Sequence, residues 1–145
     1  MSEVAPLHVL LVEDDDVAAE AVMRSLQRAK IQAPVTWVED GQAALDVLRE
    51  HDPERRSPRP RIVLLDLNMP RMNGFEFLEA IRSDAQLKDE VVFVLTTSSA
   101  DTDRNRAYNE NVAGYMVKSA VGPQFAKLIN LLDGYRQAVQ LPGQS

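Results

Sequence analysis

Side chains that can bind a metal or take part in group transfer recur directly after short apolar runs of the sequence. The acidic stretch Glu13–Asp16 follows the first of these runs, and Asp66 follows the third. The fourth run leads into Thr96, and the fifth leads into Lys118. Carboxylates, a hydroxyl and an ammonium group are the side chains that magnesium-assisted phosphoryl transfer requires, provided that the fold brings them together.

Five short apolar runs have the length and composition of buried strands. Most are continuous rather than alternating, as expected when a parallel sheet is covered on both faces. They are Leu7–Val12, Val35–Val38, Ile62–Leu65, Val91–Leu95 and Tyr115–Val117. Because segments with helical spacing alternate with them, we predict βαβ units with helices on both faces of the sheet. The predicted fold class is α/β, a flavodoxin-like doubly wound sheet of five parallel strands in the order 2-1-3-4-5.

The first three helices are placed by their apolar spacing and by the residues that begin them. The first covers about Val17–Ala29, and the second opens at Asp40 and Gly41. Asn73 is the predicted N-cap of the third helix, because its side chain can accept a hydrogen bond from the first helical turn.

The last two predicted helices differ in polarity. The segment Ala100–Val112 is polar, and Ala107 and Tyr108 are its predicted inward-facing residues. The final helix is amphipathic and is predicted to run from Phe125 to about Gln137.

The whole chain, residues 1–145, is predicted to form a single domain, with a core at about 7–138 and a tail at 139–145. No change in composition marks a second domain. The segment His51–Pro60 is a loop rich in Pro and Arg, longer than the usual connection between a helix and a strand. Because no output domain is expected after the last helix, the signal is expected to leave through protein contacts.

Composition and charge exclude several classes of function. The chain has a formal net charge of −6 and no cysteine, so neither nucleic-acid binding nor thiolate chemistry is expected. Its first apolar run is six residues long and follows no basic segment, which fits neither a signal peptide nor a membrane span. We therefore expect a cytoplasmic protein without membrane or nucleic-acid partners.

The predicted topology would bring the polar residues at the strand ends together. The carboxyl ends of parallel strands lie along one edge, and ligands bind there at the point where the strand order reverses. In this order that point lies between the first and third strands, so Glu13 and Asp14 would lie beside Asp66. Thr96 and Lys118 would approach from the other side.

Three neighbouring carboxylates disfavour one another's ionisation, and a divalent cation relieves this repulsion. A small number of hard oxygen ligands with room for water suits Mg²⁺. A carboxylate on the metal, such as Asp66, is then a candidate nucleophile that would form an aspartyl-phosphate. Lys118 would offset charge on the phosphoryl oxygens, and the Thr96 hydroxyl would donate a hydrogen bond.

Each of these residues also has a purely structural interpretation. Acidic residues such as Glu13–Asp16 commonly begin helices, and a single Asp66 after a strand can be a turn residue. Thr96 could be a helix cap, Lys118 a solvated lysine and Tyr115 a half-buried packing residue. The functional interpretation is preferred because four residue types needed for one reaction occur in a workable order at four strand ends.

Four segments together resemble the receiver domains of two-component response regulators. VLLVEDD resembles the first strand with its acidic pair, and IVLLDLNMPRMNGFEFL resembles the phosphoacceptor strand and the turn after it. VVFVLTTSS resembles the strand of the switch threonine, and GYMVKSA resembles the strand of the switch aromatic residue and the lysine. The resemblance covers Leu7 to about Leu132, in the family's order and spacing.

The resemblance implies a role for each matching residue of the site. Asp66 would be the phosphoacceptor, and Asp14, Asp66 and the backbone carbonyl of Asn68 would bind Mg²⁺ directly. Glu13 would reach the metal through water. Lys118 would contact the phosphoryl group.

The resemblance also implies a switch and a signalling surface. Thr96 would be the switch hydroxyl and Tyr115 the aromatic residue that follows its movement. The surface made by the fourth helix, fifth strand and fifth helix would carry the signal, and the protein would catalyse only its own phosphorylation and dephosphorylation.

Two features depart from the commonest family pattern. The family usually has Lys-Pro with a cis bond where this chain has Lys118-Ser119, and we predict a cis bond here as well. The long loop His51–Pro60 is the second departure. Both features resemble those of the small regulators that partner bacterial phytochromes.

The expected partners are therefore a sensor histidine kinase such as a bacteriophytochrome, a histidine phosphotransfer protein, or a second copy of the chain.

Three rival interpretations use the same elements. A phosphohydrolase of the haloacid dehalogenase type would need a second Asp two residues after the nucleophile, where this chain has Asn68. A flavodoxin-like cofactor binder would need a phosphate-binding loop after the first strand, where this chain is acidic. A pseudo-receiver that only binds partners would have little need of the full set of site residues, namely Asp14, Asp66, Thr96 and Lys118.

Overall fold

Five parallel strands form the sheet in this computed structural model, which describes residues 6–28, 30, 32–118, 127–131 and 134. The strand order is β2-β1-β3-β4-β5, which confirms the predicted doubly wound α/β fold. The strands are β1 at His8–Val12, β2 at Val35–Val38, β3 at Arg61–Leu65, β4 at Val92–Thr96 and β5 at Gly114–Val117. Each differs by at most one residue at either end from the apolar run that predicted it.

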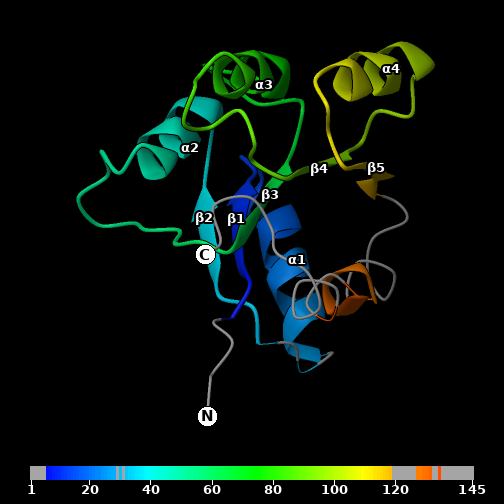
Figure 1. Cartoon of the computed structure of the whole chain (residues 1–145). Coiled ribbons are helices and arrows are strands. Elements are labelled where there is room, and N and C mark those ends of the chain that lie inside the picture. Colours follow the sequence, from blue (N-terminus) through cyan, green and yellow to red (C-terminus); the bar gives the residue numbers. More distant parts are fainter. Residues whose placement is uncertain (1–5, 29, 31, 119–126, 132–133, 135–145) are drawn as a thin grey trace.

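Alternate residues of each central strand enter two separate hydrophobic cores. From β1, Leu10 and Val12 join the core beneath the helices α2, α3 and α4, whereas Val9 and Leu11 join the core beneath α1. The helices span Asp16–Arg28 for α1, Gly41–Leu48 for α2, Gly74–Arg82 for α3 and Asp101–Asn109 for α4. Figure 1 shows α1 and the helical segment 127–131 on one face of the sheet and the other three helices on the opposite face. Burial on both faces explains why the strand sequences are continuously apolar.

Short polar side chains begin α2 and α3 as the sequence predicts. The Asp40 side chain accepts a hydrogen bond from the Ala43 N–H at 2.8 Å. Asn73 and Glu76 form a reciprocal capping box, with bonds of 3.0 and 3.1 Å between each side chain and the other residue's N–H. The predicted Asn73 N-cap is therefore confirmed.

The helix α4 packs through a single buried residue. Ala107 is fully buried, as predicted, but Tyr108 is 47% exposed and the prediction that it faces inward is wrong. Adjacent helical residues point about 100° apart, so a helix with so little apolar surface turns only one of the two toward the sheet.

In the last predicted helix, residues 127–131 are helical and Ile129 is fully buried. Its predicted ends lie outside the described residues, as does the Lys118-Ser119 bond. Among the helices that the structure describes, none is long and apolar enough to cross a membrane.

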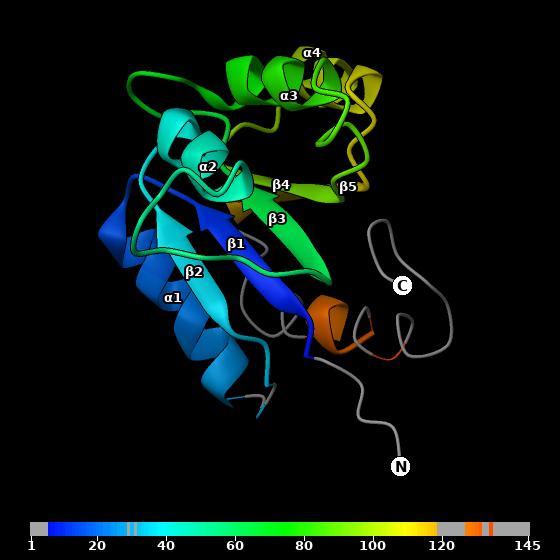
Figure 2. The same ribbon diagram turned by 60° about the vertical axis from the view of Figure 1, so that its left-hand side comes forward.

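The loop before β3 covers the exposed edge of β2. The Thr36 hydroxyl donates to the Arg56 carbonyl at 2.6 Å, and the Arg55 guanidinium donates to the Trp37 carbonyl at 3.2 Å. Asp52 accepts from the Arg55 Nε at 2.9 Å and so orders the loop itself. Figure 2 shows this connection crossing the β2 side of the sheet on its way from α2 to β3. The bond to the Trp37 carbonyl occupies a backbone group of the edge strand that could otherwise pair with another chain, and the Thr36 bond holds the loop beside it.

Gly74 allows α3 to begin directly against the end of β3. A Cβ atom at this position would lie 2.6 Å from the Leu67 Cα and 2.7 Å from the Asp66 carbonyl oxygen. Both neighbours are backbone atoms, so they cannot move aside as the end of a flexible side chain can. The close approach therefore positions the segment that follows Asp66.

We predict that Gly74→Ala lowers the free energy of unfolding by about 1–3 kcal/mol, because the added methyl group forces the backbone apart. Urea unfolding measures the loss. Gly134→Ala is the matched control, since Gly134 is helical and, apart from its chain neighbours and the backbone of its own helix, no atom of the described chain lies within 4 Å of an added Cβ. Equal stability of the two variants would contradict the role given to Gly74.

Candidate functional site

Three carboxylates meet at the carboxyl edge of the sheet. Glu13 and Asp14 follow β1, Asp66 follows β3, and one oxygen of each lies within 4.8 Å of the others. Glu13 and Asp66 are buried, whereas Asp14 is exposed. The strands β1 and β3 are neighbours in the sheet, so the register of their pairing brings these side chains together.

Lys118, which follows β5, completes the cluster from the other side. Its Nζ lies 2.5 Å from Glu13 Oε1 and 3.3 Å from Asp66 Oδ2. When all groups are ionised, three carboxylates face one ammonium group, which leaves two negative charges unbalanced. A divalent cation would supply the missing charge.

The buried Glu13 is held by contacts to its backbone and its side chain. The Trp37 indole N–H donates to the Glu13 carbonyl oxygen at 2.7 Å, and the Asp15 N–H donates to Oε2 at 3.2 Å. Burial raises the pKa of Glu13 from 4.5 to about 7, the hydrogen bond with Lys118 opposes the rise, and the charge of Asp66 adds to it. A single ammonium group shared by two carboxylates therefore does not fully stabilise the buried charge.

The pKa of Lys118 is shifted in the direction that favours its ion pairs with Glu13 and Asp66. Burial would lower the pKa of Lys118, but hydrogen bonds and charges from Glu13 and Asp66 outweigh it and raise this pKa above its usual value. The lysine is therefore held in its charged form beside Asp66.

Asp66 is positioned by the chain on both sides of it. Its N–H donates to the Val12 carbonyl at 3.0 Å, which continues the β1–β3 pairing to the site. The Asn68 N–H donates to Asp66 Oδ1 at 3.2 Å. These contacts direct Oδ1 toward the following loop and leave Oδ2 on the side of Lys118. Metal binding by the Asn68 carbonyl oxygen remains a prediction.

Thr96 ends β4 and Tyr115 lies on β5, and both form a hydrogen bond with Ser98 in the loop after β4. The buried Thr96 Oγ1 accepts a hydrogen bond of 3.4 Å from the Ser98 N–H. The Tyr115 hydroxyl donates to the Ser98 carbonyl oxygen at 2.8 Å. The two residues predicted to act as a switch are thus connected through Ser98, and no hydrogen bond between Thr96 and Asp66 occurs among the described residues.

Two supporting contacts were not anticipated from the sequence. Arg71 forms an ion pair with the buried Asp40, which joins the loop after β3 to the start of α2. Trp37 joins β2 to Glu13 through the indole bond described above. The sequence indicates that Asp40 begins a helix. The pattern of apolar residues does not indicate that Arg71 pairs with it.

The donor set fits a hard divalent cation. Adjacent oxygen ligands of Mg²⁺ lie about 3 Å apart and opposite ones about 4 Å, so oxygens within 4.8 Å of one another are close enough to hold one ion directly or through a bound water. Carboxylate oxygens are also the ligands that Mg²⁺ and Mn²⁺ prefer. The cluster can therefore hold a divalent metal.

The sheet has five strands in this order, and its carboxyl edge carries an acidic cluster and a lysine. This combination is typical of receiver-like signalling domains. The chain belongs to the response regulator receiver domain family, which it matches over residues 9–130. This finding confirms the resemblance predicted from the four sequence segments.

Similar proteins include two curated relatives. The chain is 43% identical over 113 residues to the probable methanogenesis regulatory protein FilR2 of Methanothrix harundinacea, covering 78% of this chain and 72% of that protein. It is 33% identical over 138 residues to the response regulator Rcp1 of Synechocystis, covering 94% of each.

Solved structures extend this similarity to the fold. The Mn²⁺-bound form of Rcp1 matches with a TM-score of 0.77 over 95% of this chain and 100% of that one, at 33% identity. The phosphorylated cyanobacterial phytochrome response regulator RcpA matches with a TM-score of 0.74 over 96% of this chain and 100% of that one, at 31% identity.

The raised pKa of Glu13 predicts a pH-dependent stability for the metal-free protein. Between pH 4.5 and about 7 the unfolded chain loses the Glu13 proton while the folded chain keeps it, so stability falls as pH rises. The expected loss across this window is on the order of 3 kcal/mol.

Urea unfolding in EDTA at pH 4.5, 6 and 7.5 measures this loss. Glu13→Gln should flatten the dependence, because glutamine cannot titrate. If the variant keeps the wild-type slope, another group is responsible and the assignment to Glu13 is wrong.

Proposed function

We propose that the protein accepts a phosphoryl group on Asp66 from a histidine of a sensor kinase, in a reaction that depends on Mg²⁺. The observation that carries this proposal is the position of Asp66, between two further carboxylates and the ammonium group of Lys118. This arrangement offers a nucleophile, a metal site and a fixed positive charge at one sheet edge. Membership of the receiver family supports the same reaction.

In this reaction an Asp66 carboxylate oxygen forms a bond to phosphorus while the phosphorus–nitrogen bond of the phosphohistidine breaks and the imidazole leaves. Lys118 offsets charge on the phosphoryl oxygens, and Asn68 keeps the carboxylate oriented through its N–H. Asp14 and Asp66 would bind Mg²⁺ with the Asn68 carbonyl, and Glu13 would hold one of its waters. The bound ion would supply charge neutralisation at the phosphoryl oxygens. Beyond its own phosphorylation and dephosphorylation we assign the protein no enzymatic activity.

The phosphoryl group would then change the surface formed by α4, β5 and the helix that contains 127–131. Its oxygens would draw the Thr96 hydroxyl away from the Ser98 N–H. Ser98 is also bound by Tyr115, so a movement of this loop would release the tyrosine hydroxyl and favour an inward position of the ring. A partner responds to this change only as far as it distinguishes the two states.

The partner that the relatives favour is a phytochrome-type sensor histidine kinase in the cytoplasm, because RcpA is a phytochrome response regulator. A histidine phosphotransfer protein could exchange the same phosphoryl group. A second copy of the chain could bind the changed surface, since two-fold self-association is the commonest form of oligomer.

The nucleophile is tested by incubating the protein with acetyl phosphate and Mg²⁺ and measuring its intact mass. The wild type should gain the mass of one phosphoryl group, and Asp66→Asn should gain none, because the amide lacks the nucleophilic carboxylate oxygen. Asp89→Asn removes an exposed carboxylate outside the cluster and should be labelled like the wild type. Equal labelling of all three proteins would rule out Asp66.

The role of Tyr115 is tested by comparing hydrogen–deuterium exchange before and after phosphorylation. In the wild type we expect a change in exchange over residues 97–109. Tyr115→Ala should still be phosphorylated but should show a smaller change, because the loop has lost its contact with β5. Tyr115→Phe separates loss of the hydroxyl from loss of the ring. A Tyr115→Ala profile identical to wild type in both states would exclude Tyr115 as the residue that transmits the change.

A further inference from the structure

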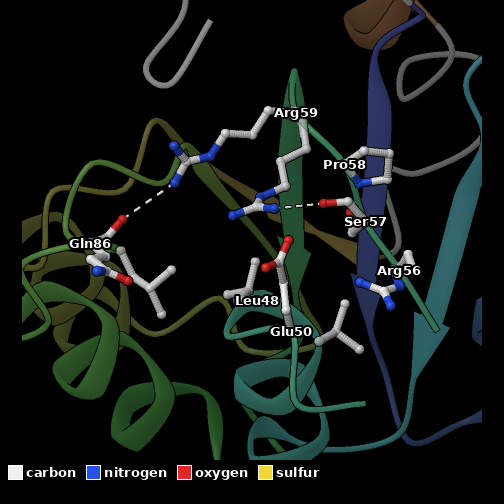
Figure 3. Close-up of a pocket in the computed structure, with 10 residues that line it drawn as sticks. Leu48, Glu50, Arg56, Ser57, Pro58, Arg59 and Gln86 are labelled. Atoms are coloured by element: carbon white, nitrogen blue, oxygen red, sulfur yellow. Dashed lines mark hydrogen bonds between the residues drawn. The ribbon is translucent and has the colours of Figure 1, made fainter. Parts of the chain in front are cut away.

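A pocket lies at the amino end of β3, away from the acidic cluster. Its volume is about 410 Å³, and it lies between the end of α2, the loop before β3 and the segment after α3. Three arginines, one serine and an apolar floor line it, namely Arg56, Arg59, Arg61, Ser57, Leu48 and Leu87. Figure 3 shows Arg56 and Arg59 on two sides of this space, with Leu48 and Glu50 below them.

The length of β3 separates this pocket from the site at Asp66. Arg61 is the first residue of the strand, and Asp66 follows its last residue. Five strand residues span roughly 16 Å. A molecule bound in the pocket therefore occupies a site distinct from the carboxylate cluster.

Two of the three arginines are already held by a buried carboxylate. Arg61 forms a bidentate pair with Glu90 through bonds of 2.9 and 2.7 Å, and Arg59 reaches the same carboxylate at 3.3 Å. Arg56 has no ion pair among the described residues, although its backbone carbonyl accepts a bond from Thr36. Its guanidinium group is therefore available to a ligand.

The charge balance favours an anion. The pocket has three guanidinium groups and two carboxylates, which are Glu50 in the lining and Glu90 behind it. The chain as a whole has a net charge of −6. This local excess of positive charge contrasts with the acidic cluster at the other end of β3. It attracts anions where the rest of the molecule repels them.

The Ser57 side chain supplies a second, independent observation. Its residue is only 5% exposed, and its Oγ has no hydrogen-bond partner in the described part of the chain. A buried hydroxyl without a partner lowers stability, and such groups mark the positions of bound ligands or waters. The backbone carbonyl of the same residue accepts a 2.6 Å bond from Arg61, so the segment is held in place.

We propose that this pocket binds a small organic phosphate. The phosphate oxygens would accept hydrogen bonds from Arg56 and Arg59, and from the buried Ser57 hydroxyl once its side chain rotates toward the pocket, since guanidinium forks and hydroxyls match phosphate geometry. The apolar part of the ligand would lie on Leu48 and Leu87. The pocket volume is many times the roughly 30 Å³ that one water molecule occupies and falls in the range of small-molecule sites, so a phosphate ion alone would not fill it.

The test uses phenyl phosphate as the probe and the chain of residues 1–145 in EDTA, so that no metal is present to direct the probe to Asp66. Titration followed by amide NMR should give saturable shifts at Ser57, Arg59 and Leu87 and none at Asp14. Inorganic phosphate should bind more weakly, because it leaves the apolar floor uncovered. Shifts centred on the acidic cluster, or no saturable shifts at all, would overturn the proposal.

Benzoate tests the choice of a phosphate over a carboxylate. It has the same ring but carries less charge and fewer acceptor oxygens than phenyl phosphate. It should therefore bind more weakly. Benzoate binding as tight as that of phenyl phosphate would refute the assignment of a phosphate ligand.

Variants of Arg56 and Ser57, whose side chains have no polar partner in the part of the chain that the structure describes, separate binding from folding. Arg56→Gln should weaken phenyl phosphate binding about tenfold, and Arg28→Gln, which changes an exposed arginine of α1, should leave it unchanged. Ser57→Ala should also weaken binding, yet without ligand it should unfold at the same or a higher temperature, because it removes an unpartnered hydroxyl. Equal affinities for Arg56→Gln and Arg28→Gln, or a large loss of stability in Ser57→Ala, would contradict the proposed site.

Discussion

The ammonium group of Lys118 faces two buried carboxylates, Glu13 and Asp66, and the rest of the site depends on this contact. Bringing the three groups together requires β5 at one edge of the sheet to present its end toward β1 and β3 at the centre. The attraction is incomplete, because one positive charge is shared by two buried carboxylates beside the exposed Asp14. The remaining negative charge makes the site selective for cations and leaves the buried Glu13 easier to protonate than an ordinary glutamate.

Most of the fold could be predicted because a parallel sheet covered on both faces needs continuous apolar strands, and those runs stand out in the sequence. Helix starts were equally readable at Asp40 and Asn73, where a short polar side chain has a local partner. Tyr108 was placed wrongly because a helix that contributes one buried residue leaves its orientation to tertiary packing rather than to spacing. Side-chain contacts between distant elements, such as Trp37 with Glu13, depend on three-dimensional register and leave no local pattern.

The two ends of β3 carry opposite charge. Asp66 and its neighbours make the carboxyl end acidic, whereas Arg61 and the arginines of the preceding loop make the amino end basic. The same loop covers the edge of β2 through Thr36 and holds the Arg61–Glu90 pair in place. The long loop before β3 thus protects the edge of β2 and lines the proposed phosphate pocket. Both roles depend on its arginines and its backbone rather than on an apolar core.

The central claim, that a divalent cation balances the cluster, is tested most directly by calorimetric titration of Mg²⁺ into three proteins. Even indirect partners of metal ligands contribute about tenfold to affinity, so Asp14→Asn should weaken binding by at least that much. Asp15→Asn removes a neighbouring exposed charge outside the cluster, and its asparagine can still accept the bond from the Val17 N–H. We expect wild-type affinity from this control. Equal affinities for Asp14→Asn and Asp15→Asn would show that general negative charge, and not the cluster of Glu13, Asp14 and Asp66, attracts the metal.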